Sequence, residues 1–146
     1  MIASPQELAA LLGRFVMQLN RAASPELFRM LGELELSFTQ LKALHLLLEA
    51  GDVNVKDVAG RLGMSLPAMS RALDGLVQRG YVERHESPTD RRARLVRLLP
   101  AGRAALDEIE RGRISALEEF TASLTDEERA GLHATLLPIL ERIRRS

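Results

Sequence analysis

The chain has 146 residues, no cysteine, a formal net charge of zero, and 46% hydrophobic but only 3% aromatic residues. This length fits one domain or one domain with an appendage, and the aliphatic composition suits packed helices. The lack of cysteine excludes disulfides, thiolate zinc sites and thiol-based redox sensing. No stretch approaches the roughly 18 apolar residues of a membrane span, so we expect a soluble, cytoplasmic protein.

The N-terminal segment is predicted to be helical. Ser4, Pro5 and Glu7 form the capping-box start of a helix. We expect the sequence Ser24-Pro25-Glu26 to break and restart it. One face of this helix is apolar, which indicates packing in the core or against a second subunit; its residues are Leu8, Leu11, Leu12, Phe15 and Leu19.

Residues 37–51 predict a second helix. Ser37 and Gln40 form a capping-box pair, Leu41, Leu44, Leu47 and Leu48 supply the apolar positions, and Gly51 ends the helix. The following residues, 53–55, are too few to predict a strand alone. They are a candidate strand for pairing with a later hairpin.

Residues 54–79 have the pattern of a helix-turn-helix. Asn54 begins a short helix that Gly63 ends, and Ser65 begins a second helix that tolerates Pro67 in its first turn. We expect the second helix to bury Leu66, Met69, Leu73, Leu76 and Val77. A helical wheel places Arg71 at the centre of the opposite face, beside Pro67, Ala68, Gly75 and Gln78. Two short helices joined by a glycine turn are typical of DNA-binding proteins.

A basic hairpin follows the second helix. Residues 81–85 and 93–98 alternate like strands, and 87–90 form a turn. Arg91, Arg92 and Arg94 lie at the tip, where such a hairpin, or wing, contacts phosphates or the minor groove. Charge is distributed accordingly: residues 1–70 carry 6 basic and 7 acidic side chains, 71–103 carry 8 and 4, and 104–146 carry 6 and 9. Local field rather than net charge governs phosphate contact, so neutrality does not argue against DNA binding.

The C-terminal part is predicted to form two helices. The first begins at Pro100 and continues to residue 124, and the second follows a capping box between Thr125 and Glu128. Pro138 should kink or break the last helix. Its apolar residues are Leu132, Leu136, Ile139, Leu140 and Ile143.

Five segments resemble the MarR family of winged helix-turn-helix transcriptional regulators. They are VAGRLG at 58–63, SLPAMSR at 65–71, LVQRGYVER at 76–84, DRR at 90–92 and LVRLLPAGR at 95–103. The resemblance implies a mainly α fold with a small antiparallel β wing. It also implies a homodimer that binds a pseudo-palindromic double-stranded DNA site, usually as a repressor.

The resemblance assigns residues 35–103 to the DNA-binding domain, and 1–34 with 104–146 to a helical dimerisation region. The implied dimer contacts are Leu8, Leu12, Phe15, Leu132, Leu136, Leu140 and Ile143. A winged helix of about 50 residues does not itself need these helices. Dimerisation is therefore favoured over a role in the core alone.

The candidate DNA contacts are Ser65, Pro67, Ala68, Ser70, Arg71, Gln78, Arg91, Arg92 and Arg94. Arg71 is best placed to read a base, because arginine to guanine is the commonest specific contact; the alternative is a solvated Arg71 paired with Asp74. Arg92 matches the family's minor-groove arginine, and we expect Asp90 to hold the wing loop by pairing with a neighbouring arginine. Gly75 indicates close approach of the helix backbone to DNA, or mere tolerance of glycine.

We expect no enzyme, cofactor or metal site. The sequence has no nucleophile–histidine set or phosphate-binding glycine loop, and His45, His85 and His133 fall in separate elements without metal-ligand spacing. The family's cleft for small aromatic or phenolic effectors makes Phe15 and His45 candidate pocket residues. Two alternatives stay open: a regulator without an effector, and a protein-docking winged helix, which the exposed arginines disfavour.

Overall fold

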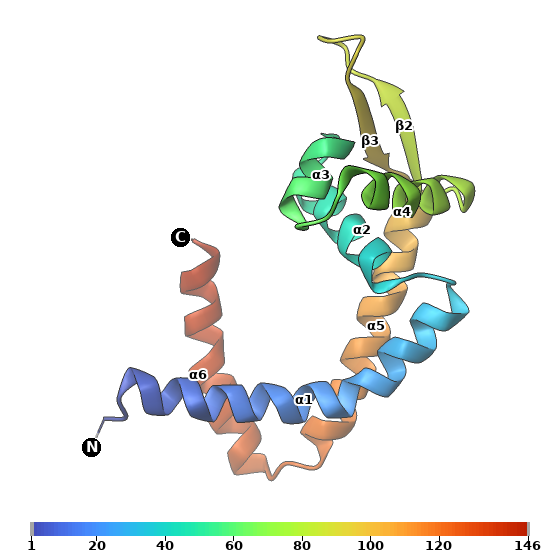
Figure 1. The fold of residues 1–146 in the computed structure, drawn as a ribbon. Coiled ribbons are helices and arrows are strands. Elements are labelled where there is room, and N and C mark those ends of the chain that lie inside the picture. Colours follow the sequence, from blue (N-terminus) through green and yellow to red (C-terminus); the bar gives the residue numbers. More distant parts are fainter. Residues whose placement is uncertain (1, 146) are drawn as a thin grey trace. The chain divides into compact units, whose positions relative to one another are not determined.

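The computed structural model describes residues 2–145. It is mainly helical with one small antiparallel sheet, as predicted (Figure 1). The elements in chain order are α1 (Pro5–Glu33), α2 (Phe38–Ala50), β1 (Val53–Asn54), α3 (Val55–Arg61), α4 (Leu66–Gln78), β2 (Val82–Glu86), β3 (Arg94–Leu98), α5 (Pro100–Ala122) and α6 (Asp126–Arg144). Across these residues, no helix combines the length and the apolarity that crossing a membrane would require.

The described chain divides into two compact units. Residues 27–112 form the first, which holds α2, α3, α4 and the sheet, and residues 2–26 with 113–145 form the second. The first unit is larger than the segment 35–103 assigned from the sequence. The reason is that the end of α1 and the start of α5 contribute apolar side chains to its core; these are Met30, Leu31, Leu106 and Ile109.

The core of the first unit lies between α2, α4 and the sheet. Its fully buried side chains include Leu44, Leu47, Met69, Leu73, Leu76, Val82 and Val96. The predicted burial of Leu66 and Val77 is wrong, because 50% and 38% of these residues are exposed. Leu66 begins α4, ahead of the packed turns, and Val77 lies about 100° around the helix from Leu76.

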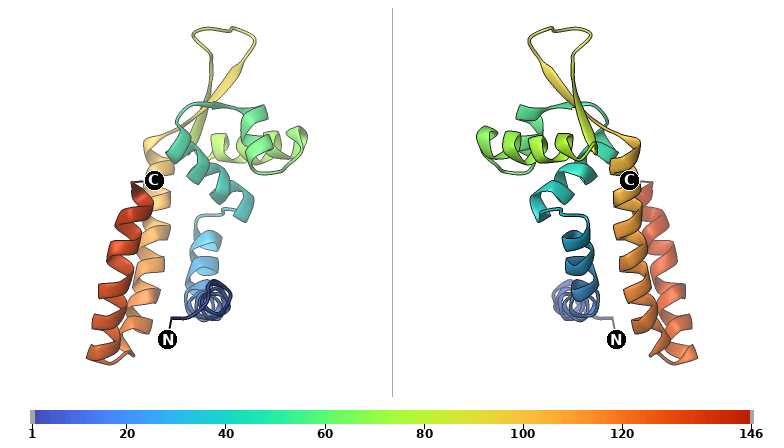
Figure 2. Two further views of the ribbon diagram at one scale, coloured as in Figure 1. Left: turned by 90° about the vertical axis from the view of Figure 1, so that its left-hand side faces the viewer. Right: turned by 90° about the vertical axis from the view of Figure 1, so that its right-hand side faces the viewer.

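The sheet joins β1 to the hairpin in the order β1-β3-β2. Val53 pairs with Val96, so the predicted short strand does pair with the wing. The hairpin extends past the helices of this unit (Figure 2). At its base Tyr81 O accepts the Leu99 N–H at 2.9 Å. Gly102 packs closely against the same carbonyl, since a Cβ at this position would lie 2.3 Å from Tyr81 O.

The helix starts follow the predicted caps, but the prolines interrupt nothing. Capping boxes begin α2 at Ser37 and α6 at Thr125. The predicted break at Pro25 is wrong, since α1 runs through it. There the Ser24 hydroxyl donates to the Asn20 carbonyl, and one missing N–H leaves the neighbouring turns intact. Pro138 likewise lies inside α6 without a break.

Candidate nucleic-acid interface

The helix-turn-helix is built by local caps. Asn54 Oδ1 accepts the Asp57 N–H at 2.8 Å and begins α3. Gly63 then takes a positive φ of 64°, a conformation that glycine adopts without steric cost. Ser65 Oγ accepts the Ala68 N–H at 3.3 Å and begins α4. The sequence therefore determines both helix starts and the turn between them.

The outer face of α4 presents Arg71 to solvent. Pro67 and Gln78 are also exposed, whereas Ala68 and Ser70 are half-buried. The alternative pairing of Arg71 with Asp74 does not form, because Asp74 Oδ1 lies 2.8 Å from Arg84 Nη2. The Arg71 guanidinium thus has no carboxylate partner among the described residues.

Gly75 faces the protein instead of the outer surface. A Cβ at this position would lie 2.6 Å from Gln40 Nε2. Gln40 is buried in α2 and donates from Nε2 to the Ala72 carbonyl at 3.1 Å. Close packing of Gln40 from α2 therefore gives this glycine a structural reason that the sequence did not indicate, and close approach of the backbone to DNA stays a prediction.

The wing loop is held by its own backbone. Ser87 N–H donates to the Ala93 carbonyl and Ala93 N–H to the Asp90 carbonyl, each at 3.0 Å. Asp90 Oδ1 accepts the Arg92 N–H at 2.9 Å. Asp90 thus orders the loop through this N–H rather than by the predicted pairing with an arginine side chain. The side chains of Arg91, Arg92 and Arg94 remain exposed.

A charged cluster that the sequence did not reveal fastens the base of the wing. Asp52 accepts from Arg97 Nη2 at 2.8 Å and from Nε at 3.2 Å, and its Oδ2 lies 3.0 Å from His85 Nε2. Arg97 also contacts Glu83 at 3.4 Å. Hydrogen bonding from Arg97 holds the pKa of Asp52 below its ordinary value, while partial burial opposes the shift. Asp52 raises the pKa of Arg97 in return.

The arginines of the 71–103 segment fall into two groups. Arg79, Arg84 and Arg97 pair with Glu35, Asp74 and Asp52, respectively. Within residues 2–145, the second group forms no ion pair and is exposed; it consists of Arg71, Arg91, Arg92, Arg94 and Arg103. Apart from Arg103 at the start of α5, the unpaired charge of this segment therefore lies on the outer face of α4 and at the tip of the wing.

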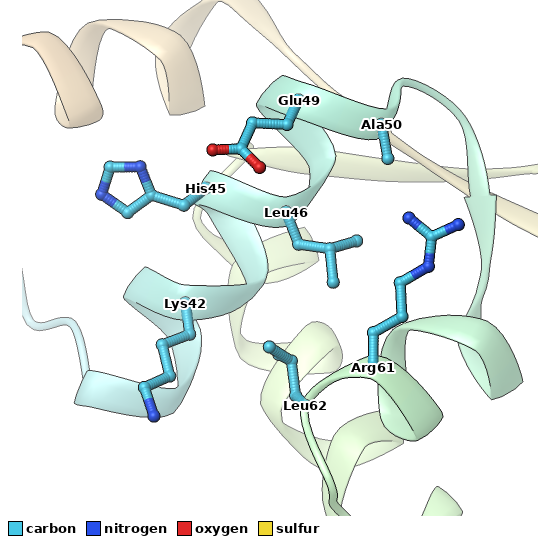
Figure 3. Close-up of a pocket in the computed structure, with 7 residues that line it drawn as sticks. All are labelled: Lys42, His45, Leu46, Glu49, Ala50, Arg61 and Leu62. Atoms are coloured by element: carbon cyan, nitrogen blue, oxygen red, sulfur yellow. The ribbon is translucent and has the colours of Figure 1, made fainter. Parts of the chain in front are cut away.

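An open pocket of about 460 Å³ lies against α2 and the end of α3 (Figure 3). Its lining residues are Lys42, His45, Leu46, Glu49, Ala50, Arg61 and Leu62. Leu46 and Leu62 point toward each other, and Arg61 extends beside Ala50. His45 thus lines a pocket, but Phe15 is not among the lining residues. Within residues 2–145, no group of three or more His, Asp or Glu side chains could hold a metal ion.

The second unit carries the apolar positions that the resemblance assigns to dimerisation. Leu8 and Leu12 of α1 are each 48% exposed, and Leu140 and Ile143 of α6 are 56% and 58% exposed. Leu136 is also exposed, and Leu132 is half-buried. Phe15 packs its ring edge-to-face on Phe120 with centroids 5.9 Å apart. This unit alone therefore leaves several large aliphatic side chains in solvent.

Comparison with known proteins places this geometry in a family. The MarR family model matches residues 34–93. The multiple antibiotic resistance protein MarR of Salmonella typhimurium is 33% identical over 130 residues, which cover 88% of this chain and 90% of that protein.

Two solved structures are similar over most of the chain. Apo MarR from E. coli has a TM-score of 0.66 and 31% identity, covering 88% of this chain and 96% of its own. A MepR mutant from S. aureus, bound to an oligodeoxyribonucleotide, has a TM-score of 0.67 and 18% identity, covering 97% and 99%. The latter likeness concerns the fold alone. From the sequence relationship and the winged helix-turn-helix together, this chain belongs to the MarR family of DNA-binding transcriptional regulators.

Proposed function

We propose that the protein is a homodimeric repressor that binds a pseudo-palindromic duplex operator and is released by a small-molecule effector. The observation that carries the proposal is the separation of the arginines. Arg79, Arg84 and Arg97 are neutralised by carboxylates, whereas Arg71 and the wing arginines are exposed and form no ion pair within the described chain. An unneutralised basic surface attracts phosphates even on a protein of zero net charge.

The contacts divide by role. Arg71 reads a base edge in the major groove, with Pro67, Ala68 and Gln78 beside it on the same face. Ser65 places the N-terminal end of α4 against the DNA backbone. The wing contacts flanking phosphates and the minor groove through Arg91, Arg92 and Arg94. The S. aureus relative, with the same fold, was solved with an oligodeoxyribonucleotide, which supports DNA as the partner here.

A dimer supplies the second recognition helix. Two helices in successive major grooves are about 34 Å apart on the DNA, so a protein two-fold axis matches a palindromic site. The exposed aliphatic side chains of α1 and α6, together with the half-buried Phe15 and Leu132, are the surface proposed to join the two copies. Their burial in a dimer would favour association, because transfer of apolar surface from water is favourable.

The proposed effector is a small aromatic or phenolic acid. In the pocket against α2 and α3, Leu46 and Leu62 offer apolar contact, and Lys42, His45 and Arg61 offer charge to a carboxylate. An effector whose affinity differs between the DNA-binding and the DNA-free conformations would shift the equilibrium between them. A ligand at 100 times its Kd should stabilise the protein by about 2.7 kcal/mol, which a thermal-shift panel of aromatic acids would detect.

The central experiment compares wild type with Arg71→Ala. Each protein is titrated with a duplex from upstream of its own gene, or selected from a random pool, and with a scrambled duplex, at 50 and 200 mM salt. Loss of a bidentate base contact should cost about 1–3 kcal/mol of discrimination. The salt dependence should change little, because Arg71 reads bases, whereas Arg91→Ala should weaken binding to both duplexes alike.

Two outcomes would contradict the proposal. If wild type selects no duplex from the random pool and shows no salt dependence, the exposed helix does not bind DNA. Docking to another protein then becomes the preferred function. If wild type selects a sequence but Arg71→Ala preserves the same preference, DNA binding stands and the base-reading role of Arg71 is wrong.

A further inference from the structure

Gln40 is the buried polar side chain of the described core, with 9% of its surface exposed. It performs two tasks. Its Oε1 accepts the Ser37 N–H at 3.0 Å, which completes the capping box of α2. Its Nε2 donates to the Ala72 carbonyl at 3.1 Å, a contact between residues 32 positions apart. The capping box needs only the bond with Ser37, so the bond with Ala72 is available to position α4.

Gly75 leaves the space that the Gln40 amide occupies. The 2.6 Å that would separate its added Cβ from Gln40 Nε2 is too short for any side chain. A free amide would swing away at little cost. The Gln40 amide is held at one end by Ser37 and at the other by Ala72, so moving it breaks a hydrogen bond.

A second side chain holds the same turn of α4 from the sheet. Arg84 of β2 donates from Nη2 to the Ser70 carbonyl at 3.1 Å and lies 3.3 Å from Ser70 Oγ. The same nitrogen pairs with Asp74 Oδ1 at 2.8 Å. The Ser70 hydroxyl is therefore occupied by the protein, which gives Ser70 a role in holding α4.

The two contacts lie on either side of Arg71. At 100° per residue, Ser70 and Ala72 are each one step around the helix from it, in opposite directions. Contacts on both flanks oppose rotation of α4 about its own axis. Such rotation would carry the Arg71 guanidinium sideways, and recognition geometry is productive only within about 0.5 Å and 10–20°.

We propose that Gln40 and Arg84 are positioning residues for DNA recognition, which together clamp residues 70–75 of α4 and set the direction in which Arg71 projects. This inference rests on the proposed reading of bases by Arg71. It makes operator specificity depend partly on Gln40 and Arg84, whose side chains contact α4 rather than the DNA. Gly75 is the small residue that lets Gln40 reach Ala72.

Three variants test the clamp. Gln40→Glu retains an acceptor for the Ser37 N–H but has no amide donor for the Ala72 carbonyl. Arg84→Lys retains the charge but loses the planar fork of donors. Gly75→Ala forces Gln40 from its place. Gly60→Ala in α3 is the matched control, because nothing lies within 4 Å of its added Cβ.

The main readout is the ratio of affinities for the operator and for a scrambled duplex. We expect this ratio to fall at least tenfold in each clamp variant, with the salt dependence unchanged because no phosphate contact is removed. A merely structural role would lower the thermal midpoint and leave the ratio unmoved. Acidification should partly restore Gln40→Glu, since a protonated carboxyl donates to Ala72 again. Operator selectivity equal to that of wild type in Gln40→Glu and Arg84→Lys would overturn the proposal.

Hydrogen exchange in the DNA-free protein separates this proposal from the proposed function. Amides of α4 should exchange faster in Arg84→Lys and Gln40→Glu, while those of α6 should not change. If wild type selects no DNA, the proposed function fails, and the positioning role for DNA fails with it even where exchange shows that the clamp exists. If Gly75→Ala does not fold, the other two variants still decide.

Discussion

Replacing Gly102 with alanine should disturb the joint between the wing and α5. The added Cβ would lie 2.3 Å from Tyr81 O, 3.1 Å from the Tyr81 carbonyl carbon and 2.7 Å from Leu98 Cδ1. The Leu98 methyl can rotate away. The Tyr81 carbonyl cannot move freely, because it accepts the Leu99 N–H at 2.9 Å at the end of the hairpin.

The size of the effect follows from that geometry. Ordinary van der Waals contact begins near 3.4 Å, so the carbonyl and the start of α5 must separate by about 1 Å. Overpacking of this kind typically costs about 1–3 kcal/mol. The added Cβ also removes glycine's entropic cost in a helix, which offsets the loss by at most about 1 kcal/mol. We expect a net loss of about 1–2 kcal/mol, or a fall in Tm of roughly 3–8 °C.

The assay is urea and thermal unfolding of wild type, Gly102→Ala and Gly32→Ala at one protein concentration. Gly32 also lies in a helix, but nothing lies within 4 Å of its added Cβ, so this control should be neutral or slightly stabilising. Equal concentrations are needed because association contributes to apparent stability. A Gly102→Ala protein as stable as Gly32→Ala would refute the claim that the Tyr81 carbonyl is immovable.

Two further predictions concern the wing base and the dimer. Asp52→Asn should lower stability at neutral pH by about 0.5–1 kcal/mol, since the Arg97 pair is partly exposed. Because the fold lowers the Asp52 pKa, its contribution exists above the ordinary aspartate pKa and disappears as pH falls through the lowered value. Thermal midpoints from pH 7 to 3 should therefore converge, and a constant difference would contradict the linkage. Leu140→Lys should shift sedimentation toward monomer without changing the circular dichroism spectrum, whereas Thr135→Lys should not; an unchanged dimer would remove Leu140 from the interface.

The helix boundaries of the winged helix-turn-helix could be predicted because they depend on residues close in sequence. Asn54 and Asp57, Ser65 and Ala68, and the pair Ser37–Gln40 are each three residues apart. A cap of this kind needs only the local backbone, so its sequence signature is sufficient. Positive φ at Gly63 and the exposure of Arg71 likewise follow from the turn and the helical period.

Tertiary structure decided which partner each charged or polar side chain found. Asp74 was within reach of Arg71 along α4 but pairs with Arg84 from β2, and Asp52 meets Arg97 across 45 positions. From the sequence, Gly75 indicated close approach of the helix backbone to DNA, yet in the structure it leaves room for the side chain of Gln40 from α2. These outcomes depend on how helices and strands pack, because several partners of suitable charge exist along the chain. Local propensity sets where an element begins and ends, whereas only packing selects among distant partners.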